Sequence, residues 1–470
     1  MPPIDLSRSL SWKSATGADA ILLDELQPNI LRAHVREHLS VLFLQFGDQT
    51  DGRTFLRDLA GLMKSAKTHL DEVEAFSTNG TPGSPYVGVG LTAAGYGQLG
   101  VPVADMPADP VFRNGMKASR HTLSDPPSTT WETPYRGAIH AVVLVGDATE
   151  GAVIARRNAV LDLLPDSGSI LVVGEEVGRG QHNANGDGIE HFGYVDGRSQ
   201  PLFLDEDVSD EENTFVDPVS WDPRFDLDRV LVPDRAAPDP DVDHGSYFVF
   251  RKLEQNVALF KQAEQSLADE LGLRGADRER AGALLIGRFE DGTPVTASRA
   301  DGEPLPVSNN FNYDTDDMGA RCPFQGHIRK TNPRGSGGFE PPTQERLHIM
   351  ARRGQTYGIR RDDPNADLLP EQRPVGDVGL LFMAFNVDLG EQFEFVQRLW
   401  ANNANFPKVP GSRLPPGLDL VIGQGARPDA GDPPIWGANQ QTTVTASPQA
   451  VTLKGGEYFF MPSLAFLRAL

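Results

Sequence analysis

Short apolar runs alternate with amphipathic stretches through the first part of the chain. The apolar runs predict strands at His38–Phe46, Tyr86–Leu91, Ala138–Val145 and Ser169–Val177. Helical spacing of apolar residues predicts helices at Arg53–Lys67, Thr92–Leu99 and Gly151–Leu164. With the short helix at 92–99 set aside as an insertion, the order βαββαβ is typical of a ferredoxin-like sheet with helices on one face.

The same alternation returns in the second part of the chain. Strands are predicted at Ser246–Phe250, Ala283–Phe289 and Val378–Val387, and helices at Leu253–Leu271 and Leu389–Asn402. The predicted fold class is therefore α+β, with two ferredoxin-like halves built from antiparallel sheets and peripheral helices. Residues 291–355 show few periodic signals, and irregular chain of that length inside a compact domain usually carries function.

An acidic stretch separates the two halves. Between Asp205 and Asp243 there are 14 acidic residues and three arginines, a net charge of −11. Such a Pro- and Asp-rich segment predicts a solvated connection, since burying it would be costly. A calcium loop is the alternative, although the EF-hand spacing is absent. The expected domains are residues 17–204 and 244–470, joined by the acidic connection 205–243.

Composition narrows the class of protein. A chain of 470 residues with 39% hydrophobic and 23% charged residues is typical of a globular enzyme. The net charge of −22 argues against nucleic acid or an anionic membrane as a partner. No apolar stretch approaches the ~18 residues of a membrane span, and no signal peptide is visible, which predicts a cytoplasmic location. The oligomeric state stays open.

The chain has a single cysteine, Cys322. An intramolecular disulfide and any multi-cysteine metal or iron–sulfur site are therefore excluded. Cys322 could also serve as a thiolate ligand, but the neighbouring Pro323 and the better-placed His327 favour a small buried apolar role for Cys322.

Two segments about 130 residues apart carry the candidate chemistry. The first, residues 190–201, places Asp196 between Gly193 and Gly197. An Asp-Gly pair is normally only a turn, but flanking glycines let the backbone approach a flat cofactor closely. The second, residues 322–334, places His327 next to Arg329, Lys330 and Arg334. An isolated histidine is more often structural than a ligand, yet these cations could neutralise the carboxylates of a cofactor.

Together the two segments resemble the dye-decolourising peroxidase family, whose hallmark Gly-x-x-Asp-Gly stands at Gly193–Gly197. The long insertions resemble its larger class, with fungal and bacterial members. The resemblance implies one haem b per chain, held between the sheet and helices of the C-terminal half. It also implies reduction of hydrogen peroxide and oxidation of small or bulky phenolic or dye-like reductants. Acidic pH is expected to favour turnover, because an unperturbed aspartate stays ionised down to about pH 3.9.

The resemblance also assigns roles to residues. His327 would be the axial ligand to iron, and Asp419, in the run Gly417–Gly423, would accept a hydrogen bond from its other ring nitrogen. Asp196 would shuttle the proton of bound peroxide, with a distal arginine stabilising the departing oxygen. The Arg-Arg-Gly-x-x-Tyr-Gly pattern points to Arg352 for that arginine, and Arg353 stays possible. Arg329, Gly193, Gly197, Leu380 and Phe382 would contact the cofactor, although Leu380 and Phe382 fit a plain core equally well.

Bulky reductants would need an electron relay, because a pocket lined by these residues is too narrow for them. Tyr357 follows Arg352 by five residues and is the first candidate, with Trp400 in reserve. A packed tyrosine hydrogen-bonded through its hydroxyl is the alternative interpretation. Two other functions stay open: a haem-binding or iron-releasing protein without peroxidase turnover, and a haem-free sheet protein. A carrier needs neither a proton shuttle nor a distal cation.

Overall fold

The computed structural model describes residues 3–34, 36–216, 218–366, 368–408 and 415–470. Its strands are β1 His38–Phe46, β2 Tyr86–Leu91, β3 Ala141–Asp147, β4 Ile170–Arg179, β5 Val232–Pro233, β6 His244–Gln255, β7 Ala351–Arg352, β8 Gln355–Tyr357, β9 Gly379–Asn386, β10 Ala430–Asp432, β11 Thr442–Val444 and β12 Val451–Met461. Its α-helices are α1 Ala18–Glu25, α2 Gln49–Ala60, α3 Ala66–Asn79, α4 Ala93–Gln98, α5 Pro110–Asn114, α6 Met116–Ser119, α7 Thr133–Arg136, α8 Glu150–Leu161, α9 Asp205–Glu212, α10 Val257–Glu270, α11 Glu279–Ile286, α12 His327–Thr331, α13 Pro342–Glu345, α14 Phe393–Phe395 and α15 Leu464–Ala469.

The strands of each half pair in the order expected for a ferredoxin-like sheet. In the first half the order is β2-β3-β1-β4, and all these pairings are antiparallel. In the second half β12 pairs with β6, β6 with β9, and β9 with β8, again antiparallel. Both sets match the order 2-3-1-4 of a βαββαβ unit, so the predicted α+β fold class is confirmed.

The two sheets join into one barrel. β12 pairs with β2 at Phe460–Leu91, and β4 pairs with β8 at Gly178–Tyr357. Because β6 also pairs with β9, the strand order closes on itself. Full closure removes exposed strand edges. The core inside the barrel is apolar, with Phe43, Phe250 and Phe459 among its fully buried side chains.

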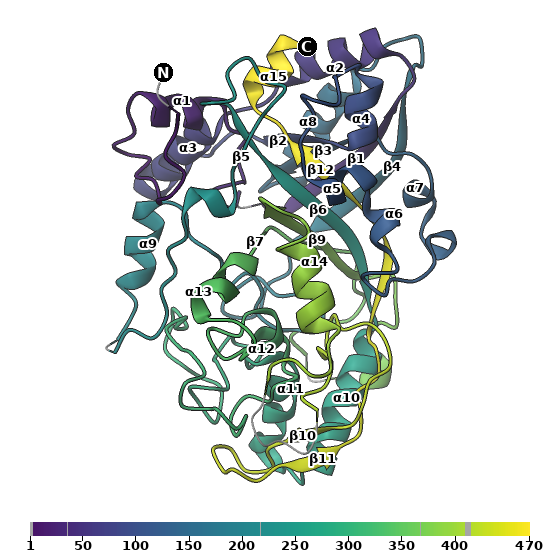
Figure 1. Cartoon of the computed structure of the whole chain (residues 1–470). Coiled ribbons are helices and arrows are strands. Elements are labelled where there is room, and N and C mark those ends of the chain that lie inside the picture. The colour runs from purple at the N-terminus through teal and green to yellow at the C-terminus, as the bar shows by residue number, and fades with distance from the viewer. Residues whose placement is uncertain (1–2, 35, 217, 367, 409–414) are drawn as a thin grey trace.

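The helices divide between two regions (Figure 1). α2, α4 and α8 lie near β1–β3 at the end of the molecule where the C-terminal α15 also lies. α10, α11 and α12 gather with β10 and β11 at the other end, below β6 and β9 in this view. The space between the second-half sheet and these lower helices holds a cavity.

One predicted strand is wrong. Residues 279–286, which include most of the run predicted as a strand at Ala283–Phe289, form helix α11. Every residue from Arg280 to Ile286 is buried, and a short buried apolar run cannot be told from a buried strand by its pattern. Gly287 ends it in a left-handed conformation (φ 104°), and its N–H donates to the carbonyl of Ala283.

Other boundaries move by a few residues. β6 continues to Gln255, where Asn256 caps α10 by accepting from the N–H of Leu259, so the predicted helix at Leu253–Leu271 begins later. The helix predicted at Leu389–Asn402 is the short α14 followed by a π-helix at Val396–Ala401. π-helical turns are rare and often lie at functional sites.

The acidic stretch is not a solvated connection along its whole length. It begins with α9, then packs Trp221, Phe225 and Leu227 into the main core, and β5 adds to the edge of β6. Buried Asp234 accepts hydrogen bonds from the N–H and hydroxyl of Ser463. Strands from both expected domains share one barrel, so the predicted boundary at 205–243 does not separate two sheets.

Within the described part of the chain, no helix is both long and apolar enough to cross a membrane. The expected cytoplasmic location stays a prediction.

Candidate active site

The cavity lies between β6 and β9 on one side and helices α11 and α12 with the π-helix on the other. Together with its mouth it encloses about 1750 Å³. The loop at residues 190–199, from the first half of the chain, lines it as well, because Val195 donates its N–H to the carbonyl of Glu290. Residues that lie far apart in sequence therefore meet at one site.

His327, the first residue of α12, lines the cavity. Its Nδ1 lies 2.9 Å from Oδ2 of Asp419, a carboxylate with no exposed surface. The other oxygen, Oδ1, accepts from the N–H groups of Val421 and Ile422 at 2.8 and 2.7 Å. Burial alone would raise the pKa of Asp419, but His327 and these N–H donors outweigh it and lower the pKa. In a neutral imidazole, a carboxylate on Nδ1 holds the ring proton on that nitrogen, so Nε2 is the nitrogen available to a metal.

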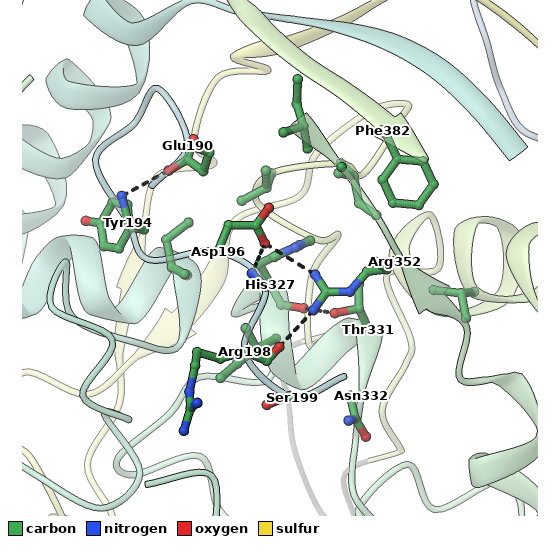
Figure 2. A pocket seen from close by; sticks show the side chains of 18 of the residues that line it. Glu190, Tyr194, Asp196, Arg198, Ser199, His327, Thr331, Asn332, Arg352 and Phe382 are labelled. Carbon is green, nitrogen blue, oxygen red and sulfur yellow. Dashed lines mark hydrogen bonds and ion pairs between the residues drawn. The ribbon is translucent and has the colours of Figure 1, made fainter. Parts of the chain in front are cut away.

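Asp196 and Arg352 form an ion pair at the same cavity, with Nη1 3.6 Å from Oδ1. Arg352 is also tied to the Asp196 loop by Nη2, which donates to the carbonyl of Arg198 at 3.0 Å, and by its N–H, which donates to Oε1 of Gln200 at 3.0 Å. About a third of each side chain is exposed, so small molecules can reach the pair. Figure 2 shows both groups and His327 in one pocket.

Arg353 points away from this cavity. Its Nε and Nη2 donate to the carbonyls of Asn29 and Ile30 at 2.8 and 2.9 Å, and its exposed fraction is 5%. It therefore fastens the N-terminal segment to β7 and β8. Of the two arginines left open by the sequence, the structure places Arg352 at the cavity.

The two glycines of the hallmark motif differ in position. Gly197 lines the cavity with φ 85°, and a Cβ added there would meet no atom within 4 Å. The open space above its backbone suits the close approach of a cofactor. Gly193 (φ 103°) does not line the cavity; its N–H closes a turn onto Glu190, and it faces Glu290. The expected contact of Gly193 with a cofactor stays a prediction.

Arg329, which was expected to contact the cofactor, lies away from the cavity. It has no exposed surface, does not line the cavity, and pairs with Oδ2 of Asp316 at 3.0 Å. It also donates to the carbonyl of Cys322 at 2.6 Å. Asp316 in turn accepts from the N–H of Arg321 and of Cys322. Arg329 therefore holds the loop that precedes His327 in shape and is not free to bind an anionic group.

Of the other arginines that line the cavity, two have no carboxylate partner among the described residues. Arg288 and Arg334 are both buried, and their guanidinium groups donate only to neutral acceptors, including Oγ of Ser199 and Oδ1 of Asn309. No ion pair to a carboxylate is found for either among the described residues. Burial lowers the pKa of Arg288 to about 10 and that of Arg334 to about 9, so both remain cationic at neutral pH. Two buried, unpaired cations are costly unless an anionic ligand binds there.

Glu190 was missed by the sequence analysis. Its carboxylate lines the cavity and accepts from the N–H groups of Phe192 and Tyr194 at 2.8 and 3.1 Å. Burial raises its pKa to about 7. It shapes the loop that carries Asp196. The sequence signal that could have identified Glu190 is its position at the start of the segment 190–201, four residues before Tyr194.

The apolar pair Leu380 and Phe382 lines the cavity from β9, as expected from their alternate positions on one strand. Neither relay candidate lines it. Tyr357 is 7% exposed, with Nζ of Lys252 4.9 Å from its ring centre. Trp400, at 3% exposed, packs edge-on against His348, which does line the cavity, with ring centres 5.4 Å apart.

No group of three or more His, Cys, Asp or Glu side chains that could hold a metal ion occurs in the described parts of the chain. The donor set at the cavity is one histidine with a carboxylate behind it, apolar walls and two unpaired arginines. This set fits a haem, which brings its own four nitrogen ligands and two carboxylates.

Comparisons with known proteins point the same way. Residues 25–178 match the sequence profile of the family described as "DyP dimeric alpha+beta barrel domain". The chain is 64% identical over its whole length to the whole of "Multifunctional dye peroxidase DyP2" from Amycolatopsis sp. (strain ATCC 39116 / 75iv2). It is 30% identical to "Peroxidase 2" of Mycetinis scorodonius, with 99% of this chain and 90% of the relative covered.

Solved structures agree. That of DyP2 from Amycolatopsis matches with a TM-score of 0.96 and 64% identity over 99% of this chain and 100% of the other. A DyP-type peroxidase from Anabaena sp. matches with a TM-score of 0.89 and 36% identity over 99% of this chain and 98% of the other. On the fold, the cavity and these matches together, the chain belongs to the dye-decolourising peroxidase family and is a peroxidase.

Proposed function

We propose that the cavity binds one haem b per chain and that Nε2 of His327 would bind its iron. Dye-decolourising peroxidases are haem enzymes, and iron in haem activates peroxide for reduction. The Asp419 carboxylate on Nδ1 orients the imidazole and makes it a more basic ligand. Arg288 and Arg334 supply the positive charge that the two haem propionates need.

Asp196 and Arg352 act as the distal pair. Asp196 takes a proton from the oxygen of hydrogen peroxide that becomes bound and returns it to the oxygen that leaves. Arg352 stays cationic throughout and stabilises the charge on the departing oxygen. The 3.6 Å ion pair, which a haem carrier would not need, is the observation that carries this proposal. Because a carboxylate stays ionised at lower pH than an imidazole, a distal aspartate favours turnover at acidic pH.

Small ions such as iodide react in the cavity itself, whereas phenols and larger donors are oxidised outside it. A structure similar to this one is a dye-decolourising peroxidase in complex with 2,6-dimethoxyphenol, at 28% identity and a TM-score of 0.76. We extend this substrate class, phenols and bulkier dye-like donors, to the present chain. No nucleic acid or membrane partner is proposed.

Bulky reductants deliver their electron through Trp400. Its ring contacts His348 at the cavity wall and stacks on Phe406 on the side away from it. Tyr357 is less suited. Burial, together with the nearby carboxylates of Glu254 and Glu132, raises its pKa well above the usual range, and Lys252 lies over the ring. A tyrosine that cannot release its proton is a poor one-electron donor.

The direct test is reconstitution of the purified protein with haem. A Soret band that changes when hydrogen peroxide is added, followed by oxidation of 2,6-dimethoxyphenol, supports the proposal. A protein that binds haem tightly, yet neither changes spectrally with peroxide nor oxidises the phenol at any pH from 3 to 8, is instead a carrier.

A further inference from the structure

An aromatic stack connects Trp400 with the surface. Phe339 is 60% exposed, and its ring stacks on Phe406 with centres 6.2 Å apart and planes 23° from parallel. Phe406 is 3% exposed and stacks on Trp400 at 5.2 Å and 9°. Burying one face of an aromatic side chain while leaving the other in water presents a flat apolar platform to solvent.

A hydrogen-bonded pair lies beside the same stack. Glu340, the next residue after Phe339, places Oε2 2.9 Å from Nε2 of His348. Nδ1 of His348 must carry a proton, since it lies 2.5 Å from the carbonyl oxygen of Glu391, which can only accept. One further proton is therefore shared between Nε2 and the Glu340 carboxylate. Oε1 of Glu340 has no hydrogen-bond partner among the described residues, and a third of the side chain is exposed.

The two routes converge. From Phe339 the stack reaches Trp400 through Phe406, and from Glu340 the hydrogen bond reaches His348, whose ring contacts Trp400 edge-on. Two residues adjacent in the chain thus offer an apolar platform and a carboxylate. Each of them directly contacts a side chain that packs on Trp400.

We propose that Phe339 and Glu340 form a surface site for phenolic reductants. The phenol ring stacks on Phe339, and its hydroxyl donates to Oε1 of Glu340. This inference rests on the proposed peroxidase function and on Trp400 as the relay, because peroxide reduction supplies the oxidising equivalent.

In this step the phenol loses one proton and one electron. The phenol O–H bond breaks, its proton goes to the Glu340 carboxylate, and its electron goes to Trp400 in its one-electron-oxidised state, which the proposed peroxidase reaction would supply. The products are a phenoxyl radical and reduced Trp400. Phenylalanine is harder to oxidise than tryptophan, so Phe339 and Phe406 fill the space between donor and relay and do not hold the electron themselves. A donor that gives an electron without a proton needs the platform but not the carboxylate.

The test compares Phe339→Ala and Glu340→Gln with the parent holoenzyme, using 2,6-dimethoxyphenol, the proton-free donor ABTS, and iodide as a small ion that reacts in the cavity. Phe339→Ala should raise KM for both organic donors about three- to tenfold, the worth of one aromatic contact. Glu340→Gln should lower kcat for the phenol by about 10²-fold, the lower end of what a placed proton acceptor contributes, and spare ABTS. Neither should change iodide oxidation.

Phe76→Ala is the matched control, because Phe76 is 61% exposed but lies in α3 of the first half. Phe339→Leu, which keeps the apolar volume without the ring, separates stacking from packing of Phe406. Binding of 4-fluorophenol, followed by ¹⁹F line broadening, gives a readout independent of turnover and should weaken in Phe339→Ala alone. Parent-like kinetics and binding in both variants, with the parent active on all three donors, would overturn the site. A parent inactive with every donor would instead overturn the proposed peroxidase mechanism.

Discussion

Nδ1 of His327 lies 2.9 Å from a carboxylate oxygen of Asp419 that is closed off from solvent. A buried carboxylate is stable only when its charge is compensated, and here the imidazole and two backbone N–H groups do so. Because Asp419 is held in turn by the chain after it, the histidine can adopt only one ring orientation. The geometry at the cavity is therefore set before any cofactor binds.

His327→Ala should remove the axial ligand, so that haem is lost or its Soret band shifts. Asp419→Asn should keep haem but raise the iron reduction potential, because the ligand loses the negative charge behind it. Spectra and potentiometric titration check both changes. A Soret band and haem content equal to the parent in His327→Ala would show that another residue binds the iron.

Arg329 and Arg334 lie five residues apart and should respond in opposite ways. Arg329→Leu leaves Asp316 buried without its partner, which should cost about 3–5 kcal/mol of unfolding free energy. Arg334→Leu removes an unpaired buried cation, so the haem-free protein should be no less stable while haem dissociates faster. Urea unfolding of the haem-free protein and haem transfer to apomyoglobin measure the two effects. Faster haem transfer from Arg329→Leu than from Arg334→Leu would contradict the assignment.

Substitution of Trp400 and of Tyr357 should show which of the two residues relays the electron. Trp400→Phe keeps the stack with Phe406 but removes the oxidisable ring, so it should abolish most turnover of a bulky dye and spare iodide. Tyr357→Phe should leave both activities near the parent level. Freeze-quench electron paramagnetic resonance should show a tryptophanyl signal that is absent in Trp400→Phe. A tyrosyl signal lost in Tyr357→Phe, together with dye turnover, would reverse the assignment.

Stability should fall as pH rises, in part through Asp432. Burial raises its pKa from 3.8 to about 7, with only a hydrogen bond from Gln325 at 3.0 Å to oppose this. Its folded pKa lies above the unfolded one, so its contribution is most favourable below about pH 4 and is lost as pH rises to about 7. Between pH 5 and 8 this group alone should lower the free energy of unfolding by about 2–3 kcal/mol. Asp432→Asn, which can still accept from Gln325, should flatten the pH dependence of urea unfolding; an unchanged slope would contradict it.

The sequence predicted the fold class because it depends on local signals. Its motifs also singled out residues that line one cavity, and the roles of these residues stay predictions. β1 and β2 were predicted with their observed bounds, since both are apolar runs bounded by polar residues or turns. His327, Asp196 and Arg352 were found through their motifs. The predictions that failed depend on the direction in which a side chain points. Arg329 and Arg334 are equally basic neighbours of His327, and only the fold turns one into the protein and the other toward the cavity.

Other features left too weak a signal or none. Helix α11 is buried all round, so its pattern could not be told from that of a buried strand. Arg288 lies in no motif, and its role follows only from the lack of a carboxylate partner. The acidic stretch was predicted to be solvated because its many charged residues outnumber the apolar ones. Trp221, Phe225 and Leu227, which lie among these charges, are nevertheless buried.

The most direct test of the account is the rate at which the haem-loaded Asp196→Asn variant reacts with hydrogen peroxide in stopped-flow experiments, with Arg352→Leu alongside. Both variants should bind haem with a parent-like Soret band, because the Asp196 and Arg352 side chains make no hydrogen bond or ion pair to His327, Arg288 or Arg334 among the described residues. The second-order rate should fall about 10²–10⁴-fold in Asp196→Asn, the usual loss when a proton shuttle is removed. A rate equal to the parent from acidic to neutral pH, at full haem content, would contradict the claim that Asp196 and Arg352 drive peroxide cleavage.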